Sequence, residues 1–317
     1  MKKYMILAVS ALLFVACSND GEIDNWNGEI RLCTTTQLQT RATQELQSTQ
    51  FDAGEEVDIF INENVSSSGY YYPQPIEYTA DGNGGLNTYM DTPRYPTSGN
   101  DVNIFGVYPN NKAFNISDPY SFEVQYDQSD DDNYKASDLM LGAAANPVSR
   151  QAGAVAVTFK HMLSKININL TIGAGLNADS LVNATVLVLN TMPSTTFNVQ
   201  GAAIGDPEGG AQSDVINIIA GNLPDNSAAI SGDALSHSAI IIPQPIEGGT
   251  EFIQVVLHWN DPSYTELTYS LPETEVMEFE SGKVYTYNLT VNRYEITATT
   301  SIDDWVTGAT ITGDATN

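Results

Sequence analysis

Apolar and polar residues alternate along much of the chain after residue 50, and this period of two predicts β-strands rather than helices. The longest alternating run is 162–172, where one face would carry Ile166, Ile168, Leu170 and Ile172. Further strands are expected at 56–62, 102–108, 155–159, 182–189, 215–219, 239–242, 252–257 and 285–291. Helical periodicity is confined to a turn or two near 178–182 and 231–235.

Clusters of Gly, Pro, Asn and Asp separate these strands, for example at 81–85, 206–210 and 247–249. Short strands at regular spacing with such turns indicate a β-sandwich or barrel. The stretch 143–153 is rich in small residues and comes shortly after an acidic segment, so we place a domain boundary at its end. The sequence therefore predicts an all-β protein with one domain over 42–153 and a second over 154–317.

The first 17 residues have the pattern of a secretory signal. Two lysines precede an apolar run from Tyr4 to Ala16, which is shorter than the roughly 20 residues of a membrane-spanning helix. Phe14-Val15-Ala16-Cys17 resembles a bacterial lipobox, in which the cysteine is lipidated and becomes the first residue. We therefore expect a lipoprotein signal peptide over 1–17 with Cys17 acylated. The alternative is an ordinary signal peptide with a cysteine there by chance.

Cys17 and Cys33 are the only cysteines, so a disulfide framework and a cysteine-based zinc site are both excluded. The formal net charge of −27 argues against nucleic acid as a partner, because phosphate binding requires a basic surface. The low charged fraction of 16% leaves Thr, Ser, Asn, Gln and Gly to form most of the polar surface, as in many extracellular β-proteins.

Candidates for catalysis or metal binding are few. The three histidines have no second His or Cys at ligand spacing, and no hydrolase, phosphate-binding or zinc-protease motif is present. The acidic stretch 127–133 fails the calcium-loop pattern, because Asp132 stands where glycine is required. It remains a candidate for an irregular calcium loop or a solvated acidic loop. We expect no cofactor, no metal and no enzymatic activity.

Residues 25–50 are polar and weakly patterned, and within them Arg41 is followed by Ala42. An arginine in a flexible polar segment is accessible to a trypsin-like protease, although a plain surface arginine would look the same. Tyr70, Tyr71 and Tyr72 could form an aromatic platform for sugar stacking or part of a strand and turn.

Five segments in order resemble one family. They are Thr40-Arg41-Ala42 with Phe51–Phe60, the run Phe159–Lys165 with His161, the strand Ala239–Gln244, the run Phe279–Tyr287 with Gly282 and Lys283, and Ile302-Asp303-Asp304-Trp305. Together, behind a lipobox, they identify the chain as a member of the fimbrillin family, the protease-processed lipoprotein pilins of anaerobic Gram-negative bacteria.

This resemblance implies two transthyretin-like β-sandwich domains in tandem. It also implies that 18–41 is a propeptide, removed when an Arg-specific protease cuts between Arg41 and Ala42. Loss of the first strand would open a groove that a strand of another pilin subunit fills. The implied location is the cell surface, first as an outer-membrane lipoprotein with a transient lipid anchor and then in the fimbrium.

The segment after Trp305 is the candidate donor strand, with Val306, Ala309 and Ile311 as its apolar anchors. It could equally be a frayed terminus, which would suit a tip subunit better than a stalk subunit. The alternative function is a surface glycan-binding lipoprotein that uses aromatic residues such as Tyr70–Tyr72 or Trp259.

Overall fold

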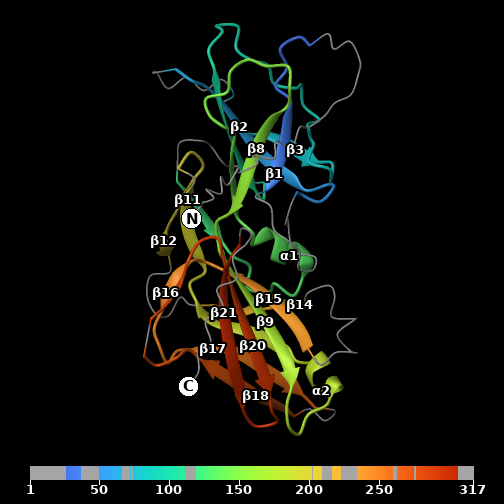
Figure 1. Cartoon of the computed structure of the whole chain (residues 1–317), viewed down its shortest axis with the longest axis vertical. Helices are drawn as coiled ribbons and strands as arrows, with labels where there is room; N and C mark the ends of the chain where they lie inside the picture. Colours follow the sequence, from blue (N-terminus) through green and yellow to red (C-terminus); the bar gives the residue numbers. More distant parts are fainter. Residues whose placement is uncertain are drawn as a thin grey trace, which may run out of the picture.

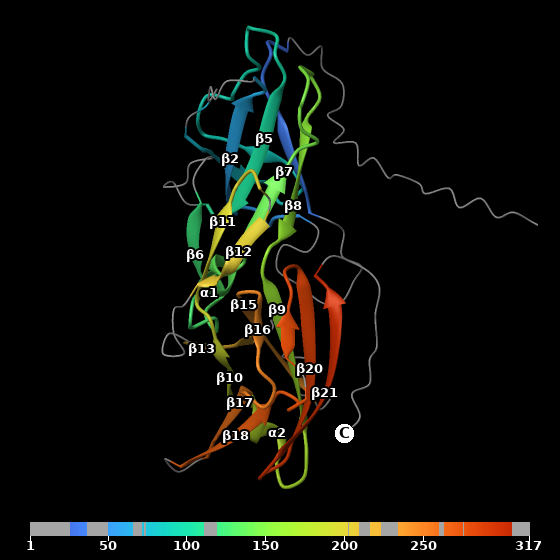
Figure 2. The ribbon, with the colours of Figure 1, turned by 90° about the vertical axis from the view of Figure 1, so that its left-hand side faces the viewer.

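The computed structural model describes residues 26–36, 50–65, 72, 74–110, 119–201, 203–208, 216–222, 234–259, 263–274 and 276–305. The described chain is elongated and built almost wholly from strands, with β1, β2, β3 and β8 in the upper half and β9, β15, β17, β18, β20 and β21 in the lower half (Figures 1 and 2). This confirms the all-β prediction.

The strands, in chain order, are β1 (Leu32–Thr36), β2 (Glu56–Glu63), β3 (Ile76–Ala80), β4 (Leu86–Asn87), β5 (Val102–Tyr108), β6 (Tyr120–Glu123), β7 (Met140–Ala143), β8 (Val155–His161), β9 (Ser164–Ile172), β10 (Thr185–Thr191), β11 (Ser194–Asn198), β12 (Ala203–Glu208), β13 (Ile216–Ile219), β14 (Gly221–Asn222), β15 (Ala234–Ile241), β16 (Gln244–Ile246), β17 (Glu251–His258), β18 (Tyr264–Ser270), β19 (Met277–Phe279), β20 (Lys283–Val291) and β21 (Ile296–Asp304). The helices are α1 (Asp131–Ala136) and α2 (Ala178–Val182). Neither is long and apolar enough to cross a membrane, and the described residues contain no other helix.

Most expected strands are present, and the alternation along β9 buries Ile166, Ile168 and Leu170 as predicted. The strand expected at 182–189 begins later, at Thr185, because α2 occupies the residues before it. The helical turn expected at 231–235 is wrong for its described residues, which belong to β15. Part of the acidic stretch 127–133 is not a loop, because Asp130 caps α1 by accepting bonds from the backbone N–H groups of Asp132 and Asn133.

The upper sheet has seven strands in the order β1-β8-β7-β5-β2-β3-β4. Its β1–β8 pair is parallel and its other pairs are antiparallel. One face of this sheet buries a group of apolar side chains that we call the N-terminal cluster. Its fully buried members include Ile30, Phe51, Val57, Ile59, Ile61, Val102, Ile104, Met140 and Val157.

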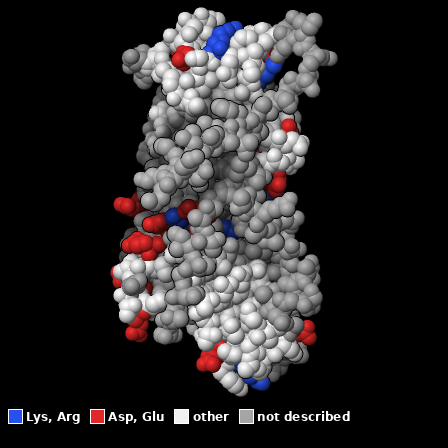
Figure 3. Space-filling view, in the orientation of Figure 1, with Lys and Arg blue, Asp and Glu red and all other residues white. Residues whose placement is uncertain are grey.

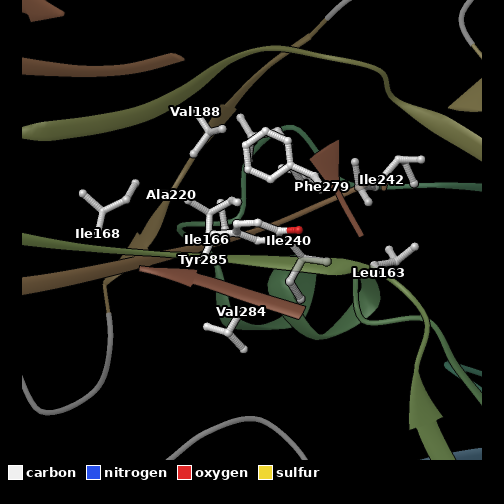
Figure 4. Packing of buried hydrophobic residues seen from close by; sticks show 14 of the residues in the cluster. Leu163, Ile166, Ile168, Val188, Ala220, Ile240, Ile242, Phe279, Val284 and Tyr285 are labelled. Atoms are coloured by element: carbon white, nitrogen blue, oxygen red, sulfur yellow. The ribbon is translucent and has the colours of Figure 1, made fainter. Parts of the chain in front are cut away.

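The lower half is a sandwich of a five-stranded sheet, β14-β15-β9-β20-β21, and a four-stranded sheet, β13-β10-β17-β18. A second group of side chains, the C-terminal cluster, fills the space between them. Figure 4 shows part of it, in which Ile166 and Ile168 of β9 lie across from Val188 of β10. The three-stranded sheet β12-β11-β6 and the pair β16-β19 complete the fold.

The domain boundary at 153/154 stays a prediction. The strand pairing suggests a boundary a few residues later in the chain. β8 begins at Val155 and pairs with β1 and β7 of the upper sheet, whereas β9 pairs with β15 and β20 of the lower one. We therefore propose a boundary at 162–163, between β8 and β9. Phe60 and Val107 of the upper sheet also belong to the C-terminal cluster, so the two halves share apolar contacts.

Acidic and a few basic side chains are scattered over the described surface in Figure 3. No broad basic area is visible among the described residues on this face, in line with the excess of 39 Asp and Glu over 12 Lys and Arg.

Candidate functional site

Strand β1 is the first described strand, and it pairs in parallel with β8 along its whole length. The register places Leu32 beside Val155 and Thr36 beside Phe159. The backbone pairing extends one residue further, since the N–H of Val155 donates to the carbonyl of Arg31 at 2.8 Å. β1 therefore completes the hydrogen bonding of β8, which would otherwise be the edge of the sheet.

The other side of the same segment is also bonded to backbone. The N–H of Thr34 donates to the carbonyl of Gly84 at 2.7 Å, and Cys33 and Gly85 form an antiparallel bridge just before β4. Although β1 and β4 are the two ends of the strand order, they therefore lie next to each other. β1 closes the upper sheet on itself, and the sheet would have two open edges without it.

The hydrogen bonds continue toward the N-terminus of β1. The N–H of Ile30 donates to the carbonyl of Pro93 at 2.7 Å, and the N–H of Tyr95 donates to the carbonyl of Gly28 at 2.9 Å. Residues 28–34 thus contact the segment 84–95 as well as β8.

The inner face of this segment is apolar. Ile30 is fully buried and Leu32 is 5% exposed, and both belong to the N-terminal cluster. Removing the segment would uncover the cluster along β8. We call the space that residues 26–36 occupy, between β8 and the segment 84–95, the β1 groove.

An aromatic residue anchors the far end of the segment. The ring of Trp26 has Arg150 Cζ 4.8 Å from its centroid, and Tyr95 meets it at 6.3 Å with an interplanar angle of 73°. Its Nε1 donates to the carbonyl of Glu29 at 2.9 Å. The sequence shows little sign of this arrangement, because only Ile30 and Leu32 alternate in a segment otherwise rich in threonine and glutamine.

The site residues expected from the sequence lie outside the described residues. This holds for the lipidation site Cys17, the processing site Arg41 and Ala42, and the donor anchors Val306, Ala309 and Ile311. The structure does describe the residues that precede the processing site and the donor anchors in the chain. β1 ends at Thr36, on the N-terminal side of Arg41, and Trp305 is the last described residue.

Trp305 holds the C-terminal end of the described chain in place. It is 1% exposed, and its ring stacks on that of His161 with centroids 4.2 Å apart and an interplanar angle of 5°. His161 is the last residue of β8, and its Nδ1 lies 2.7 Å from Asp138 Oδ1. The candidate donor segment therefore begins beside the lower end of the strand that borders the β1 groove.

Of the two arginines between Lys3 and Arg94, Arg31 lies within the described residues. The carbonyl of Arg31 is bonded to Val155, so its backbone lies within the strand pairing. A protease that binds an extended backbone would have to break this pairing to cut at Arg31. Arg41 lies beyond the end of β1.

The residues considered for sugar or metal binding have structural contacts. The hydroxyl of Tyr72 accepts from the N–H of Arg94 at 3.0 Å, and Tyr70 and Tyr71 lie outside the described residues. Trp259 donates from Nε1 to Thr265 Oγ1 at 3.0 Å, and Arg293 Cζ lies 5.4 Å from its ring. No group of three or more His, Cys, Asp or Glu among the described residues could hold a metal ion.

These observations define the class of the molecule as an elongated β-protein whose N-terminal strand closes its first sheet. Residues 40–305 match the sequence model of the fimbrillin-like family, which is most of the chain. The chain belongs to the fimbrillin-like family. No curated protein sequence matches it.

Solved structures show the same fold. A candidate cell adhesion protein from Bacteroides uniformis is 18% identical, with a TM-score of 0.62 over 88% of this chain and 98% of its own. Another from Bacteroides ovatus is 16% identical, with a TM-score of 0.64 over 89% of this chain and 99% of its own. The family supports a pilus subunit at the cell surface that assembles with other pilin subunits, and it points to a structural protein.

Proposed function

We propose that this chain is a structural or adhesive pilus subunit. In this proposal it is exported as a lipoprotein through Cys17, cut between Arg41 and Ala42 by an Arg-specific protease, and assembled by β-strand exchange through the β1 groove. The observation that carries the proposal is the position of β1. It closes the upper sheet with backbone bonds on both sides and an apolar inner face, and it lies on the N-terminal side of Arg41.

Cleavage matters because it changes what holds β1 in place. Before the cut, β1 is covalently linked to β2, so it rebinds the groove as part of the same molecule. A strand of another subunit must then compete with this intramolecular rebinding and is at a disadvantage. After the cut, the resident and the incoming strand compete as separate molecules. Ile30 and Leu32 each contribute roughly 1.5–3 kcal/mol by their burial, so the emptied groove favours any strand that restores those contacts.

Exchange of this kind produces a filament. The surface that accepts a strand lies in the upper half of the molecule (Figure 1), whereas the candidate donor segment follows Trp305, which comes directly after β21 and stacks on His161. The two surfaces differ, so contacts between subunits are head-to-tail and do not close into a dimer. Val306, Ala309 and Ile311 would supply the apolar positions of the donor strand in a stalk subunit. A tip subunit would use its groove but not this segment.

The test begins with the full-length protein and an Arg-specific protease. We expect one cut, after Arg41, followed by ladders on native gels and filaments in electron micrographs. Arg41→Ala should abolish both the cut and the assembly. The matched control is Arg31→Ala, which should be cut and should assemble as the wild type does. If Arg41→Ala were processed and assembled normally, the proposal would be wrong.

A second variant ends the chain at Trp305 and tests the donor segment. In a stalk subunit this variant should be cut but should cap growing filaments, since it can accept a strand and cannot donate one. If it polymerises alone as well as the wild type does, residues 306–317 are not the donor strand.

A glycan-binding lipoprotein is the alternative function. It has less support, because both aromatic side chains already have contacts within the protein. The hydroxyl of Tyr72 accepts a hydrogen bond from the backbone N–H of Arg94, and the guanidinium of Arg293 lies over the Trp259 ring.

A further inference from the structure

The β1 groove ends in an aromatic clamp whose two halves lie on opposite sides of the proposed cut. Trp26 belongs to the segment that processing would remove, whereas Arg150 and Tyr95 belong to the subunit that remains. Arg150 Cζ lies 4.8 Å from the centroid of the Trp26 ring, and Tyr95 meets the edge of the ring from another side. A guanidinium over an indole face is the most favourable form of cation–π contact. Removing residues before 42 would leave this pair of side chains without the ring that they hold.

The residue two positions after Trp26 has a backbone conformation that favours glycine. Gly28 has φ +93°, a conformation that side chains other than that of glycine rarely adopt. A Cβ added there would lie 2.6 Å from Arg150 Nη2 and 3.0 Å from Nη1. The carbonyl of Gly28 meanwhile accepts from the N–H of Tyr95, which fixes the backbone against the groove. Arg150 therefore covers an aromatic ring, and the positive φ two residues after that ring favours glycine.

The apolar contacts follow at fixed distances from this glycine. Ile30 and Leu32, two and four positions after Gly28, are the residues that enter the N-terminal cluster. Because side chains on one face of a strand recur every second residue, an incoming strand can fill both places only in one register. The clamp sets that register, since it accepts an aromatic ring at one position only.

We propose that the β1 groove selects a partner strand with an aromatic residue two positions before a glycine and apolar residues two and four positions after it. This deepens the proposed function and rests on it. Residues 306–317 contain no aromatic residue, and Trp305 is already buried against His161. The preferred occupant is therefore a strand of a different pilin subunit, and self-assembly through residues 306–317 should be the weaker reaction.

The experiment uses the full chain cut at Arg41, with the protease then inhibited and a reducing agent present. A fluorescent synthetic peptide of residues 24–36 competes with the resident segment, and fluorescence anisotropy gives its relative affinity. The variant peptides are Trp26→Leu, which keeps apolar bulk but loses the ring, and Gly28→Ala. Asn27→Ala is the matched control, since Asn27 is exposed. A peptide of residues 306–317 represents a second copy.

We expect Trp26→Leu to bind roughly two- to fivefold more weakly, the size of a cation–π contact at an exposed site. Gly28→Ala should also bind more weakly, and Asn27→Ala should bind as the wild-type peptide does. The acceptor variant Arg150→Ala removes an exposed side chain, so the fold should be retained. On this acceptor the difference in affinity between the wild-type and Trp26→Leu peptides should nearly vanish. A purely hydrophobic contact of Trp26 would keep that difference.

Three results would overturn the inference, and they separate it from the proposed function. If the wild-type peptide exchanges but Trp26→Leu binds equally well, the clamp does not select and strand exchange still stands. If the peptide 306–317 binds as tightly as the peptide 24–36, selection for an aromatic strand is wrong. If no peptide enters the cut protein, strand exchange itself fails and the inference fails with it.

Discussion

A buried histidine in the lower sandwich should make the protein sensitive to mild acid. His237 lies on β15 opposite Ile168 of β9, on the face that enters the C-terminal cluster, and it is 4% exposed. Neither of its ring nitrogens has a hydrogen-bond partner among the described residues. Burial without a partner disfavours the charged ring and lowers the pKa of His237 from 6.5 to about 4.

The sign and size of the effect follow from this shift. Between pH 6.5 and 4 the unfolded chain binds a proton at residue 237 that the folded chain does not, so the free energy of unfolding falls as the pH falls. The contribution is fully present above pH 6.5. A pKa difference of this size corresponds to about 3 kcal/mol lost by the time the pH reaches 4. That loss is a large part of the stability of an ordinary domain, which is about 5–15 kcal/mol.

The assay is urea unfolding of the wild type and two variants at a series of pH values from 8 to 4. His237→Leu and His237→Asn are both uncharged at every pH, one apolar and one polar, so their absolute stabilities should differ. Subtracting either variant from the wild type cancels the carboxylates and the other histidines. We expect both difference curves to be flat above pH 7 and to fall by about 3 kcal/mol toward pH 4. Difference curves that stay flat throughout would refute the reasoning, because the ring would then be hydrated or paired in the folded state.

Three further variants test the packing around the groove and the C-terminal end, each by urea unfolding at pH 7.5. Leu32→Ala in the uncut protein should cost about 2–4 kcal/mol, as for a buried leucine, and an unchanged midpoint would mean that β1 is not docked in solution. Gly106→Ala should cost about 1–3 kcal/mol, since its Cβ would lie 2.4 Å from Cζ of Phe159; a neutral result would show that this ring can move aside. Trp305→Ala should cost about 3–5 kcal/mol by removing the ring stacked on His161, and a loss below 1 kcal/mol would argue against that stack.

Strands with strong apolar–polar alternation could be located from the sequence, because the surroundings of their two faces require different residue types. β2, β5, β9, β17 and β20 all fall within a few residues of the expected ranges. Some of the strands that were missed carry weak patterns, whereas β3 and β11 alternate over only five residues each. β21 has no fully buried residue, and β12 is largely exposed, so neither shows the contrast on which periodicity depends.

The candidate site was harder to predict for the same reason. Residues 25–50 read as polar and weakly patterned, yet β1 forms there because β8 and the segment 84–95 supply its hydrogen bonds. Nothing local to Trp26 or Gly28 indicates Arg150, which is more than 100 residues away in the chain and meets them only after the upper sheet closes.

The sequence by itself determined the all-β class, the family motifs and the position of Arg41 ahead of the first well-patterned strand, since each depends on residue identity or short-range periodicity. The tertiary structure alone decided that β1 closes the upper sheet, that Arg31 is held within its pairing, and that Arg150 and Tyr95 enclose Trp26. The physical reason is that these contacts join segments far apart in the chain. Their geometry is set by the closure of a sheet rather than by any pattern within one segment.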